Sequence, residues 1–326
     1  GIGVLVADTP YGPFEDPIEK PLVWQKEHWN DIDPTVFIDD DGQAYMYWGN
    51  PDVYYAKLNE DMISTSGPIV KLPKQQHYQE GPWCYKRNGK YYMAFASTCC
   101  PEGIGYAMSD NPTGPWTTMG YIMEPTHRSR GNHPGIIDFK GKSYVFGLNY
   151  DILRIETAQH HERRSVSVAE MKYNEDGTIQ TVPYWKDTVL EQVGTFDPYQ
   201  KVEAETMAWG YGLKTAVSKK HGIYLTNIND SETLTLRGVD FGKKGAKKFT
   251  AEVASIEGGC CIEIRLDSAE GPMVGKLDIP ATGGPKEFRT FTCPINEAKG
   301  VHDLVFVFRG KPETNLMNWN RWEFTR

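Results

Sequence analysis

Residues 33–50 read DPTVFIDDDGQAYMYWGN, and altered copies follow as EGPWCYKRNGKYYMAFAS (80–97) and HPGIIDFKGKSYVFGLNY (133–150). Each copy has a polar residue before Pro or Gly, then a short strand, a turn and a Tyr-rich strand. Asp-Gly and Asn-Gly turns supply the positive φ angles that a tight hairpin needs. The pattern predicts hairpins with turns at Asp41-Gly42, Asn88-Gly89 and Lys140-Gly141.

A second repeat alternates with the hairpins. GIGVLVADTPYGPF (1–14) is similar to GIGYAMSDNPTGPW (103–116), and weaker relatives cover 52–68 and 164–179. Each predicts an alternating strand followed by a polar turn. The polar leaders of the hairpins stand at 33, 80 and 133, and a period of about fifty residues with four short strands is typical of a β-propeller blade. We therefore expect three blades in 31–180 and the outer end of a fourth in 1–30.

The blade period stops near residue 200. Alternating strands with turn signals follow at 231–242, 249–255, 261–267 and 301–310. Short strands at this spacing predict a β-sandwich. The expected domains are an N-terminally incomplete propeller at 1–193 and a sandwich at 201–326, with the boundary at Gly194–Lys201. The whole chain is expected to be all-β.

Composition narrows the class of ligand. The 326 residues carry 35 basic and 43 acidic side chains, a net charge of −8, which argues against nucleic acid or an anionic membrane as partner. A neutral ligand fits better. No apolar stretch is long enough to span a bilayer. Neighbouring cysteines on a strand point to opposite faces, so Cys99–Cys100 and Cys260–Cys261 are not expected to form disulfides. We expect six structural or incidental thiols.

The polar leaders are the candidate catalytic residues. The first strand of each blade lines the channel of a propeller, so Asp33, Glu80 and His133 should converge there. Two facing carboxylates raise one another's proton affinity, which suits one of them to act as an acid on a glycosidic bond. The alternatives are that Asp33 only begins a turn, Glu80 is solvated, and His133 satisfies a buried backbone group.

Aromatic and basic side chains near the leaders could contact a sugar. Trp83 is the aromatic residue expected to stack on a sugar ring. A further set is expected mainly in the core, namely Trp48, Trp116, Tyr45 and Tyr92. Arg164, in the pair Arg163-Arg164, could reach a substrate hydroxyl or could be part of a solvated charge run.

Together, WNDIDPTVFIDDDGQAYMYWGN, YQEGPWCYKRNGKYYMAFAS, GNHPGIIDFKGKSYVFGLNY and RSVSVAEMKYNEDGTI resemble glycoside hydrolase family 43. The resemblance implies a five-bladed propeller and inverting hydrolysis by three carboxylates. It implies that Glu80 is the general acid and Asp33 the residue that tunes its pKa. His133 corresponds to the histidine near a central calcium ion or its waters, and Arg164 to a substrate contact. Trp83 and Asn149 are also expected to bind substrate.

The resemblance leaves one catalytic residue without a counterpart. The general base of the family lies well ahead of the DIDPTVF motif, in the first blade, and only 32 residues precede Asp33. Asp8 and Asp16 fall in the outer-strand repeat instead. The expectation is that this sequence lacks the base and is weakly active or inactive.

The C-terminal part resembles a family 6 carbohydrate-binding module, a jelly-roll sandwich. The matching motifs are VEAET (202–206), VDFG (239–242), TGGPKEFRTFTCPI (282–295) and NWNRWEF (318–324). The resemblance implies a structural calcium held by Glu203 and Glu205, with Asn320 in place of the usual acidic ligand. Ile223 and Phe288 stand where the Tyr and Trp of the main sugar cleft are expected, which weakens the case for sugar binding there.

Two functions follow from these residues. The first is an arabinofuranosidase or β-xylosidase acting on arabinoxylan-type hemicellulose. The second is a non-catalytic, lectin-like carbohydrate-binding protein, with a sandwich that braces the propeller as a further option. The partner is a hemicellulose oligo- or polysaccharide, and the chain is expected to be a monomer. The resemblance implies a secreted or periplasmic bacterial protein, although the sequence shows no signal peptide.

Overall fold

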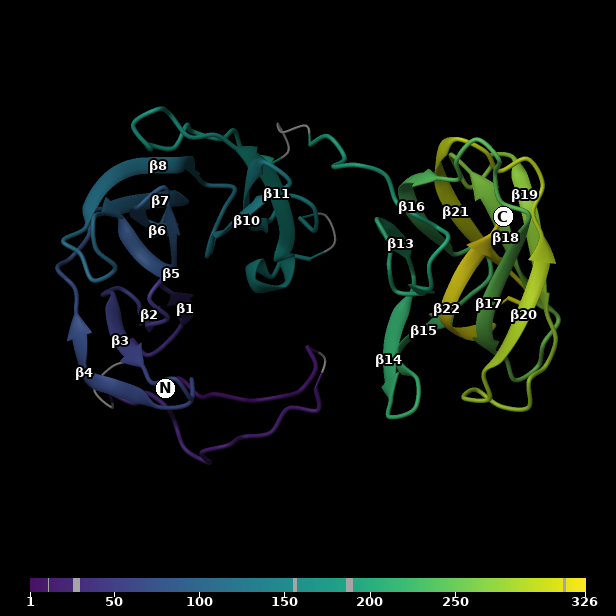
Figure 1. Ribbon diagram of the computed structural model, residues 1–326, viewed down its shortest axis with the longest axis horizontal. Coiled ribbons are helices and arrows are strands. Elements are labelled where there is room, and N and C mark those ends of the chain that lie inside the picture. Colours follow the sequence, from purple (N-terminus) through teal and green to yellow (C-terminus); the bar gives the residue numbers. More distant parts are fainter. Residues whose placement is uncertain (11, 26–29, 155–156, 186–189, 313–314) are drawn as a thin grey trace. The chain divides into compact units, whose positions relative to one another are not determined.

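The computed structural model describes residues 1–326 except 11, 26–29, 155–156, 186–189 and 313–314 (Figure 1). Across these residues the regular structure is β-strand apart from a 3₁₀ helix, η1 (His160–Arg163). The chain divides into two compact units, 1–191 and 192–326. A search of the described residues finds no helix with the length and apolar character needed to cross a bilayer.

Three antiparallel sheets form most of the first unit and lie side by side around a common centre in Figure 1. Within each sheet the strands pair in chain order, as the repeats predict. The first sheet consists of β1 (Thr35–Ile38), β2 (Ala44–Trp48), β3 (Tyr54–Leu58) and β4 (Thr65–Lys71). The second consists of β5 (Tyr78–Arg87), β6 (Lys90–Ser97), β7 (Glu102–Ser109) and β8 (Thr117–Thr126). The third consists of β9 (Gly135–Phe139), β10 (Lys142–Asn149) and β11 (Ser165–Met171).

The hairpin turns follow the glycine positions. Asn88-Gly89 joins β5 to β6 with φ angles of 50° and 77°, and Lys140-Gly141 joins β9 to β10 with 48° and 79°. Both are the predicted two-residue turns with positive φ at each position. The turn before β2 is longer: Gly42, at φ 85°, donates its N–H to Asp39 O at 2.9 Å. The prediction of hairpins is confirmed in all three sheets.

The repeat shared by residues 1–14 and 103–116 recurs in the structure only in part. Gly12 and Gly114 have φ angles of 83° and 91° and donate their N–H groups to Thr9 O and Asn111 O, each at 3.1 Å. Ahead of Gly114 stands the long strand β7. Ahead of Gly12 the structure has only the isolated bridges Ile2–Val23 and Val6–Glu15, so the strand expected there is wrong. A strand needs a continuous series of backbone hydrogen bonds to a neighbouring strand. Among the described residues, the partners of 1–8 form only single bridges.

Aromatic side chains fill the space inside and between these sheets. Trp48 and Tyr92 are almost completely buried, and Tyr45 and Trp116 are also part of the core. Tyr47 packs against Trp116 with ring centroids 6.5 Å apart, which joins β2 to the segment before β8. The prediction that these aromatic residues belong to the core rather than to a sugar site is confirmed.

The second unit is a sandwich of two antiparallel sheets. One sheet has the order β14-β15-β22-β17-β20, with β12 paired to β22, and the other has the order β13-β16-β21-β18-β19. Its core includes Phe249, Phe306, Trp319 and Trp322, all almost fully buried. The strands are β12 (Val202–Glu203), β13 (Trp209–Tyr211), β14 (Lys214–Ser218), β15 (Gly222–Ile228), β16 (Thr233–Asp240), β17 (Lys248–Ala254), β18 (Cys260–Leu266), β19 (Met273–Ile279), β20 (Arg289–Pro294), β21 (Val301–Arg309) and β22 (Met317–Thr325).

The expectation of six free thiols is wrong at one pair. Cys99 and Cys100 form a disulfide with each other. The alternation argument fails there because β6 ends at Ser97 and β7 begins at Glu102, so both cysteines lie in the connecting turn rather than on a strand. Cys260 and Cys261, at the start of β18, are buried free thiols as expected.

Candidate active site

The three polar leaders meet. Asp33 stands just before β1, Glu80 lies in β5, and His133 precedes β9. His133 Nε2 lies 3.4 Å from Glu80 Oε1 and 3.7 Å from Asp33 Oδ2. The predicted convergence of these side chains from three sheets is confirmed, and one donor atom from each lies within 4.8 Å of the others.

Gly81 makes this arrangement sterically accessible. Its φ is +61°, and a Cβ atom placed there would lie 2.7 Å from Cγ of the His133 ring. Any larger side chain would therefore occupy the space of the imidazole. The Glu80-Gly81-Pro82 sequence thus supplies both the carboxylate and the gap into which His133 packs. The irregular pairing of β5 with β6 between Glu80 and Trp83 falls at this point.

Asn50 is a site residue that the sequence reasoning missed. Its Nδ2 donates to Glu80 Oε2, and Gln79 Nε2 donates to Asn50 Oδ1 at 3.2 Å. Asn50 is buried, so the amide holds the carboxylate in place. A signal was available in the repeat. Asn50, Ser97 and Tyr150 each end their copy of the motif, at the same distance from the polar leader.

Glu102 is a second residue that was missed. It is buried at the start of β7 and accepts the backbone N–H groups of Gly131 and Asn132 at 2.6 and 2.5 Å. These two residues directly precede His133. Glu102 therefore fixes the segment that delivers the imidazole to the cluster. No repeat position in the sequence marked it.

The electrostatics of the cluster differ from the simple two-carboxylate picture. Burial raises the pKa of Asp33, and the charge of Glu80 adds to that effect. His133 lowers the pKa of Glu80, and its effect outweighs that of burial. Burial disfavours a charged His133, but Glu80 and Asp33 more than compensate and raise the pKa of its imidazole. The expected rise in pKa is therefore right for Asp33, where burial outweighs His133, and wrong for Glu80, where the hydrogen bond with His133 outweighs burial.

The other predicted substrate residues lie in different surroundings. Arg164 is exposed, and its positive charge contributes to lowering the pKa of Glu80, after the larger effect of His133. Trp83 is 37% exposed on β5, three positions beyond Glu80. Asn149 is buried, and its Oδ1 accepts the N–H of Asp151 at 2.9 Å.

The sandwich contains a candidate cation site. Glu203 and Glu205 flank Ala204, whose N–H donates to Asn320 O at 2.9 Å. Glu205 Oε2 and Asn320 Oδ1 are both buried and have no hydrogen-bond partner among the described residues. Burial raises the pKa of Glu205. Orphaned oxygen atoms on adjacent segments are suitable ligands for a hard cation such as Ca²⁺.

Phe288 and Ile223 occupy the sandwich positions expected for a sugar platform. Phe288 packs against His221 and Tyr224, with ring centroids 4.6 and 5.4 Å apart, and is only partly exposed. Ile223 lies on β15 opposite Val217. Phe288 is thus engaged by its own neighbours.

Comparisons with known proteins agree with this architecture. The family model described as glycosyl hydrolases family 43 matches residues 1–179, and that of carbohydrate binding module family 6 matches 203–326. An arabinoxylan arabinofuranohydrolase of Paenibacillus polymyxa is 35% identical over 362 residues, and one of Bacillus subtilis (strain 168) is 34% identical over 365. Both alignments cover all of this chain, which spans 56% and 70% of those proteins.

A solved structure is similar along nearly the whole chain. It is a glycoside hydrolase family 43 arabinoxylan arabinofuranohydrolase from Bacillus subtilis in complex with cellotetraose, with a TM-score of 0.89 and 32% sequence identity. The match covers 99% of this chain and 74% of the solved one. The predicted family and fold class are therefore confirmed for both units.

Proposed function

Because the chain belongs to glycosyl hydrolases family 43 and carries a family 6 carbohydrate binding module, we propose that it acts on arabinoxylan-type hemicellulose by inverting hydrolysis. The scissile bond joins an α-L-arabinofuranosyl or a β-D-xylosyl unit to the rest of the substrate. The observation that carries the proposal is the meeting of Asp33, Glu80 and His133 at one point. The two relatives that align with all of this chain are arabinoxylan arabinofuranohydrolases, which favours the arabinofuranosyl unit.

The chemistry assigns a role to each member of the cluster. Inverting hydrolysis needs an acid that protonates the leaving oxygen and a carboxylate that activates water on the opposite face of the sugar. Glu80 is the group that donates the proton, and His133 Nε2, 3.4 Å from Glu80 Oε1, is close enough to influence its protonation. Asp33 is the proposed residue that tunes the pKa of the acid, Glu80. Arg164, Trp83 and Asn149 are the proposed substrate contacts.

We propose that a polypeptide of these 326 residues turns its substrate over slowly. Among the described residues, Asp33 and Glu80 are the carboxylates grouped with His133. Glu102 also lies near the cluster, but it is buried and both of its oxygen atoms accept backbone N–H groups. Glu102 is therefore unsuited to activate water. In residues 1–32, neither Asp8 nor Asp16 matches the motif that carries the general base of the family.

The activity can be tested with nitrophenyl arabinofuranoside and nitrophenyl xyloside. Glu80→Ala should lower turnover by at least about a hundredfold, since general acid catalysis contributes roughly 10²–10⁴. Glu60→Ala, an exposed residue between β3 and β4, is the matched control and should leave turnover unchanged. Equal rates for the wild type and Glu80→Ala would eliminate Glu80 as the acid.

The alternative function is carbohydrate binding without catalysis. The lowered pKa of Glu80 favours it, because an ionised carboxylate is a poor proton donor at neutral pH. Calorimetry with xylo- and arabino-oligosaccharides separates the two functions. Binding without any release of sugar supports the alternative, whereas clear turnover by the 326-residue chain refutes both the alternative and the expected loss of the base.

Calcium is the proposed metal, with Glu203, Glu205 and Asn320 as its ligands in the sandwich. His133 stays a proposed contact of a propeller calcium or its waters. A site saturated at about 100 times its Kd stabilises a fold by roughly 2.7 kcal/mol. Added Ca²⁺ should therefore raise the melting temperature of the sandwich, and Glu205→Ala should abolish that rise. Equal melting temperatures with Ca²⁺ and with chelator would exclude the sandwich site.

The proposed location is outside the cytoplasm, secreted or periplasmic. The disulfide between Cys99 and Cys100 supports it, because disulfides persist mainly in oxidising compartments. The proposed partner is a hemicellulose chain, and the proposed oligomeric state is a monomer. Neither nucleic acid nor a membrane surface is expected to bind, given the net charge of −8.

A further inference from the structure

The Cys99–Cys100 disulfide lies at the same end of its sheet as Glu80. Glu80 pairs with Ala96 and Tyr78 with Ser97, so the turn that follows Ser97 continues from the end of β5 that carries the carboxylate. Thr98 in this turn donates its N–H to His77 O at 2.8 Å, which ties the turn to the segment before β5. Both cysteines are exposed.

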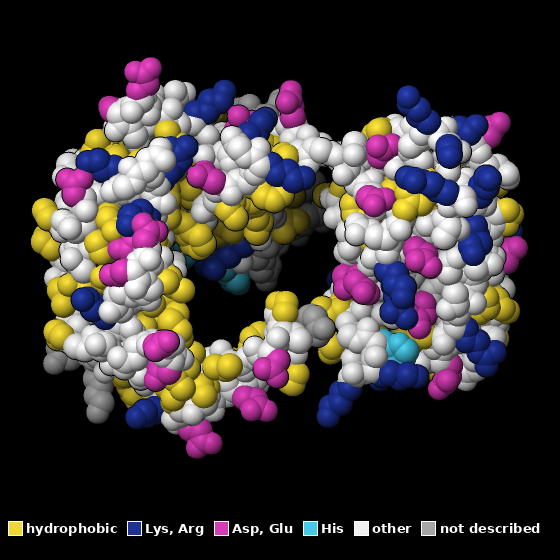
Figure 2. Space-filling model, viewed as in Figure 1, with side chains coloured by type: hydrophobic (Ala, Val, Ile, Leu, Met, Phe, Trp, Pro, Cys, Tyr) yellow, Lys and Arg dark blue, Asp and Glu magenta, His cyan; other side chains and the backbone are white. Residues whose placement is uncertain are grey.

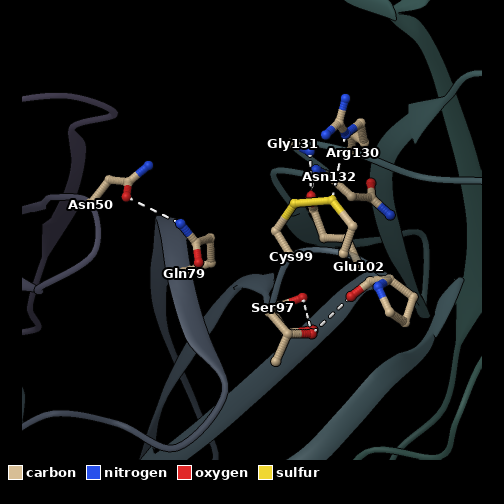
Figure 3. Close-up of a disulfide and its surroundings, with 11 residues drawn as sticks. Asn50, Gln79, Ser97, Cys99, Glu102, Arg130, Gly131 and Asn132 are labelled. Carbon is tan, nitrogen blue, oxygen red and sulfur yellow. Dashed lines mark hydrogen bonds between the residues drawn. A yellow bond between two sulfur atoms is a disulfide. The ribbon is translucent and has the colours of Figure 1, made fainter. Parts of the chain in front are cut away.

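Contacts of the turn lead directly to the cluster. Arg130 Nε donates to Cys100 Sγ at 3.5 Å. The next residue, Gly131, is so near the carboxylate that a Cβ atom placed on it would lie 3.7 Å from Glu80 Oε1. Figure 3 shows the disulfide beside Arg130, Gly131 and Asn132, with Glu102 next to it. Arg130 and Gly131 thus connect the disulfide to the carboxylate of the proposed acid, Glu80.

This disulfide contributes little as a crosslink. The stabilisation from a disulfide grows with the length of chain that it closes, and a bond between neighbours closes almost none. The turn is already held by backbone and side-chain bonds, including those of Thr98 Oγ1 to Ser97 O at 2.7 Å and to Pro101 O at 3.1 Å. The main consequence of the disulfide is therefore the exposed surface that its two sulfur atoms form.

That surface has the chemistry of a sugar platform. Two linked sulfur atoms make a polarisable apolar patch without a thiol hydrogen, and Pro101 beside them is also exposed. Dispersion attraction allows such a patch to contact the apolar face of a sugar ring. Arg130 is exposed and offers hydrogen-bond donors to hydroxyl groups at the rim of the ring.

We propose that the Cys99–Cys100 disulfide is an apolar contact surface for a sugar unit of the bound hemicellulose, beside the Glu80 carboxylate. This inference rests on the proposed function, since it assigns a substrate contact within the same site. A neutral polyhydroxyl ligand fits the patch better than an anionic one, because Gly131, next to the arginine that contacts Cys100, lies beside the carboxylates of Glu80 and Glu102.

The test uses the accessibility of the bond in the full chain. Dithiothreitol reduces the disulfide, an alkylating reagent traps the thiols, and mass spectrometry counts them over time. The four other cysteines are buried, so they serve as an internal reference. An arabinoxylan oligosaccharide at about ten times its Kd should slow the reduction roughly tenfold, because only about a tenth of the molecules stays free. Maltotriose at the same concentration is the control and should have no effect.

The outcomes separate the contact from the proposed activity when hydrolysis is measured in parallel. Protection with hydrolysis supports both, and protection without hydrolysis supports the contact while it overturns the activity. Hydrolysis with an unchanged rate of reduction overturns the contact alone. Neither protection nor hydrolysis overturns both.

Discussion

His133 controls the charge state of the cluster at the residue scale. Its imidazole lies within 3.7 Å of both carboxylates and packs on the bare backbone of Gly81. A positive charge there stabilises the ionised form of Glu80 and is itself stabilised by Glu80 and Asp33. His133 and Glu80 therefore each influence the protonation of the other.

Replacing His133 by Gln tests this coupling. The His133→Gln variant keeps a hydrogen-bonding side chain but removes the positive charge. The pKa of Glu80 should rise from its lowered value, because the largest cause of that lowering is lost. Titration of ¹³C-labelled carboxyl groups by NMR measures the change. An unaltered Glu80 titration would show that His133 does not set its charge.

The same pair predicts how stability depends on pH. The pKa of His133 is raised in the folded state above its ordinary value of 6.5. Its contribution to the free energy of unfolding is therefore fully present below about pH 6.5 and is lost as the pH rises through the folded-state value. The difference in stability between wild type and His133→Gln, from urea unfolding, should shrink over that window. A difference that grows with pH would contradict the sign.

Gly81 offers a sharper structural test. Gly81→Ala adds a methyl group 2.7 Å from the His133 ring at a φ of +61°, and should destabilise the fold by about 2–5 kcal/mol and displace the imidazole. Gly42→Ala, at φ +85° with nothing within 4 Å, should cost only the conformational part, about 1–2 kcal/mol. Urea unfolding measures both. Equal losses would mean that the ring of His133 moves freely.

At the scale of elements, the connections between strands build the site. Asp33 and His133 lie just before the first strands of their sheets, and Asn50 follows β2. A residue before the first strand of a hairpin and a residue after its second strand both lie at the open end, opposite the turn. Glu102, at the start of β7, fastens the segment before β9 to the neighbouring sheet. Figure 2 shows hydrophobic side chains gathered along the inner edge of the first unit.

Removing the Glu102 carboxylate should loosen that connection. Glu102→Ala leaves the N–H groups of Gly131 and Asn132 without an acceptor, at about 1–3 kcal/mol for each buried group. Glu124→Ala, an exposed residue on β8 of the same sheet, should change stability by less than about 0.5 kcal/mol. Chemical denaturation compares the two variants. A Glu102 variant as stable as the Glu124 variant would remove its positioning role.

At the scale of the whole molecule, the chain has separate cores. The largest cluster of buried apolar residues runs from Val202 to Phe324 and draws only on the second unit. Among the described residues of the first unit, three smaller clusters form its core. A unit with its own core is expected to fold by itself.

The second unit therefore provides a test by isolation. Residues 192–326 expressed alone should unfold cooperatively, because both sheets of the sandwich and their core lie within them. Thermal denaturation followed by circular dichroism measures the transition, and the intact chain is the reference. A broad, non-cooperative melt of the isolated unit would contradict an independent core.

Much of the fold and part of the site could be predicted from repetition. The shared design of residues 33–50, 80–97 and 133–150 predicted three hairpins and the meeting of their leaders, because equivalent positions in a propeller face one axis. The repeat also contains the position of Asn50, which ends the first copy at the same distance from its polar leader as Ser97 and Tyr150 in the other copies. Glu102 could not be found this way, since its partners are backbone N–H groups of a distant segment and no side-chain pattern records them.

The sequence by itself determined the all-β class, the two units and the identity of the converging residues, because periodic patterns of turn and strand residues are local. Tertiary structure alone decided that the pKa of Glu80 is lowered, since that depends on an imidazole 53 positions away in the chain and 3.4 Å away in space. It also decided the Cys99–Cys100 bond, because the turn between β6 and β7 replaces the strand geometry that would have kept the two thiols apart.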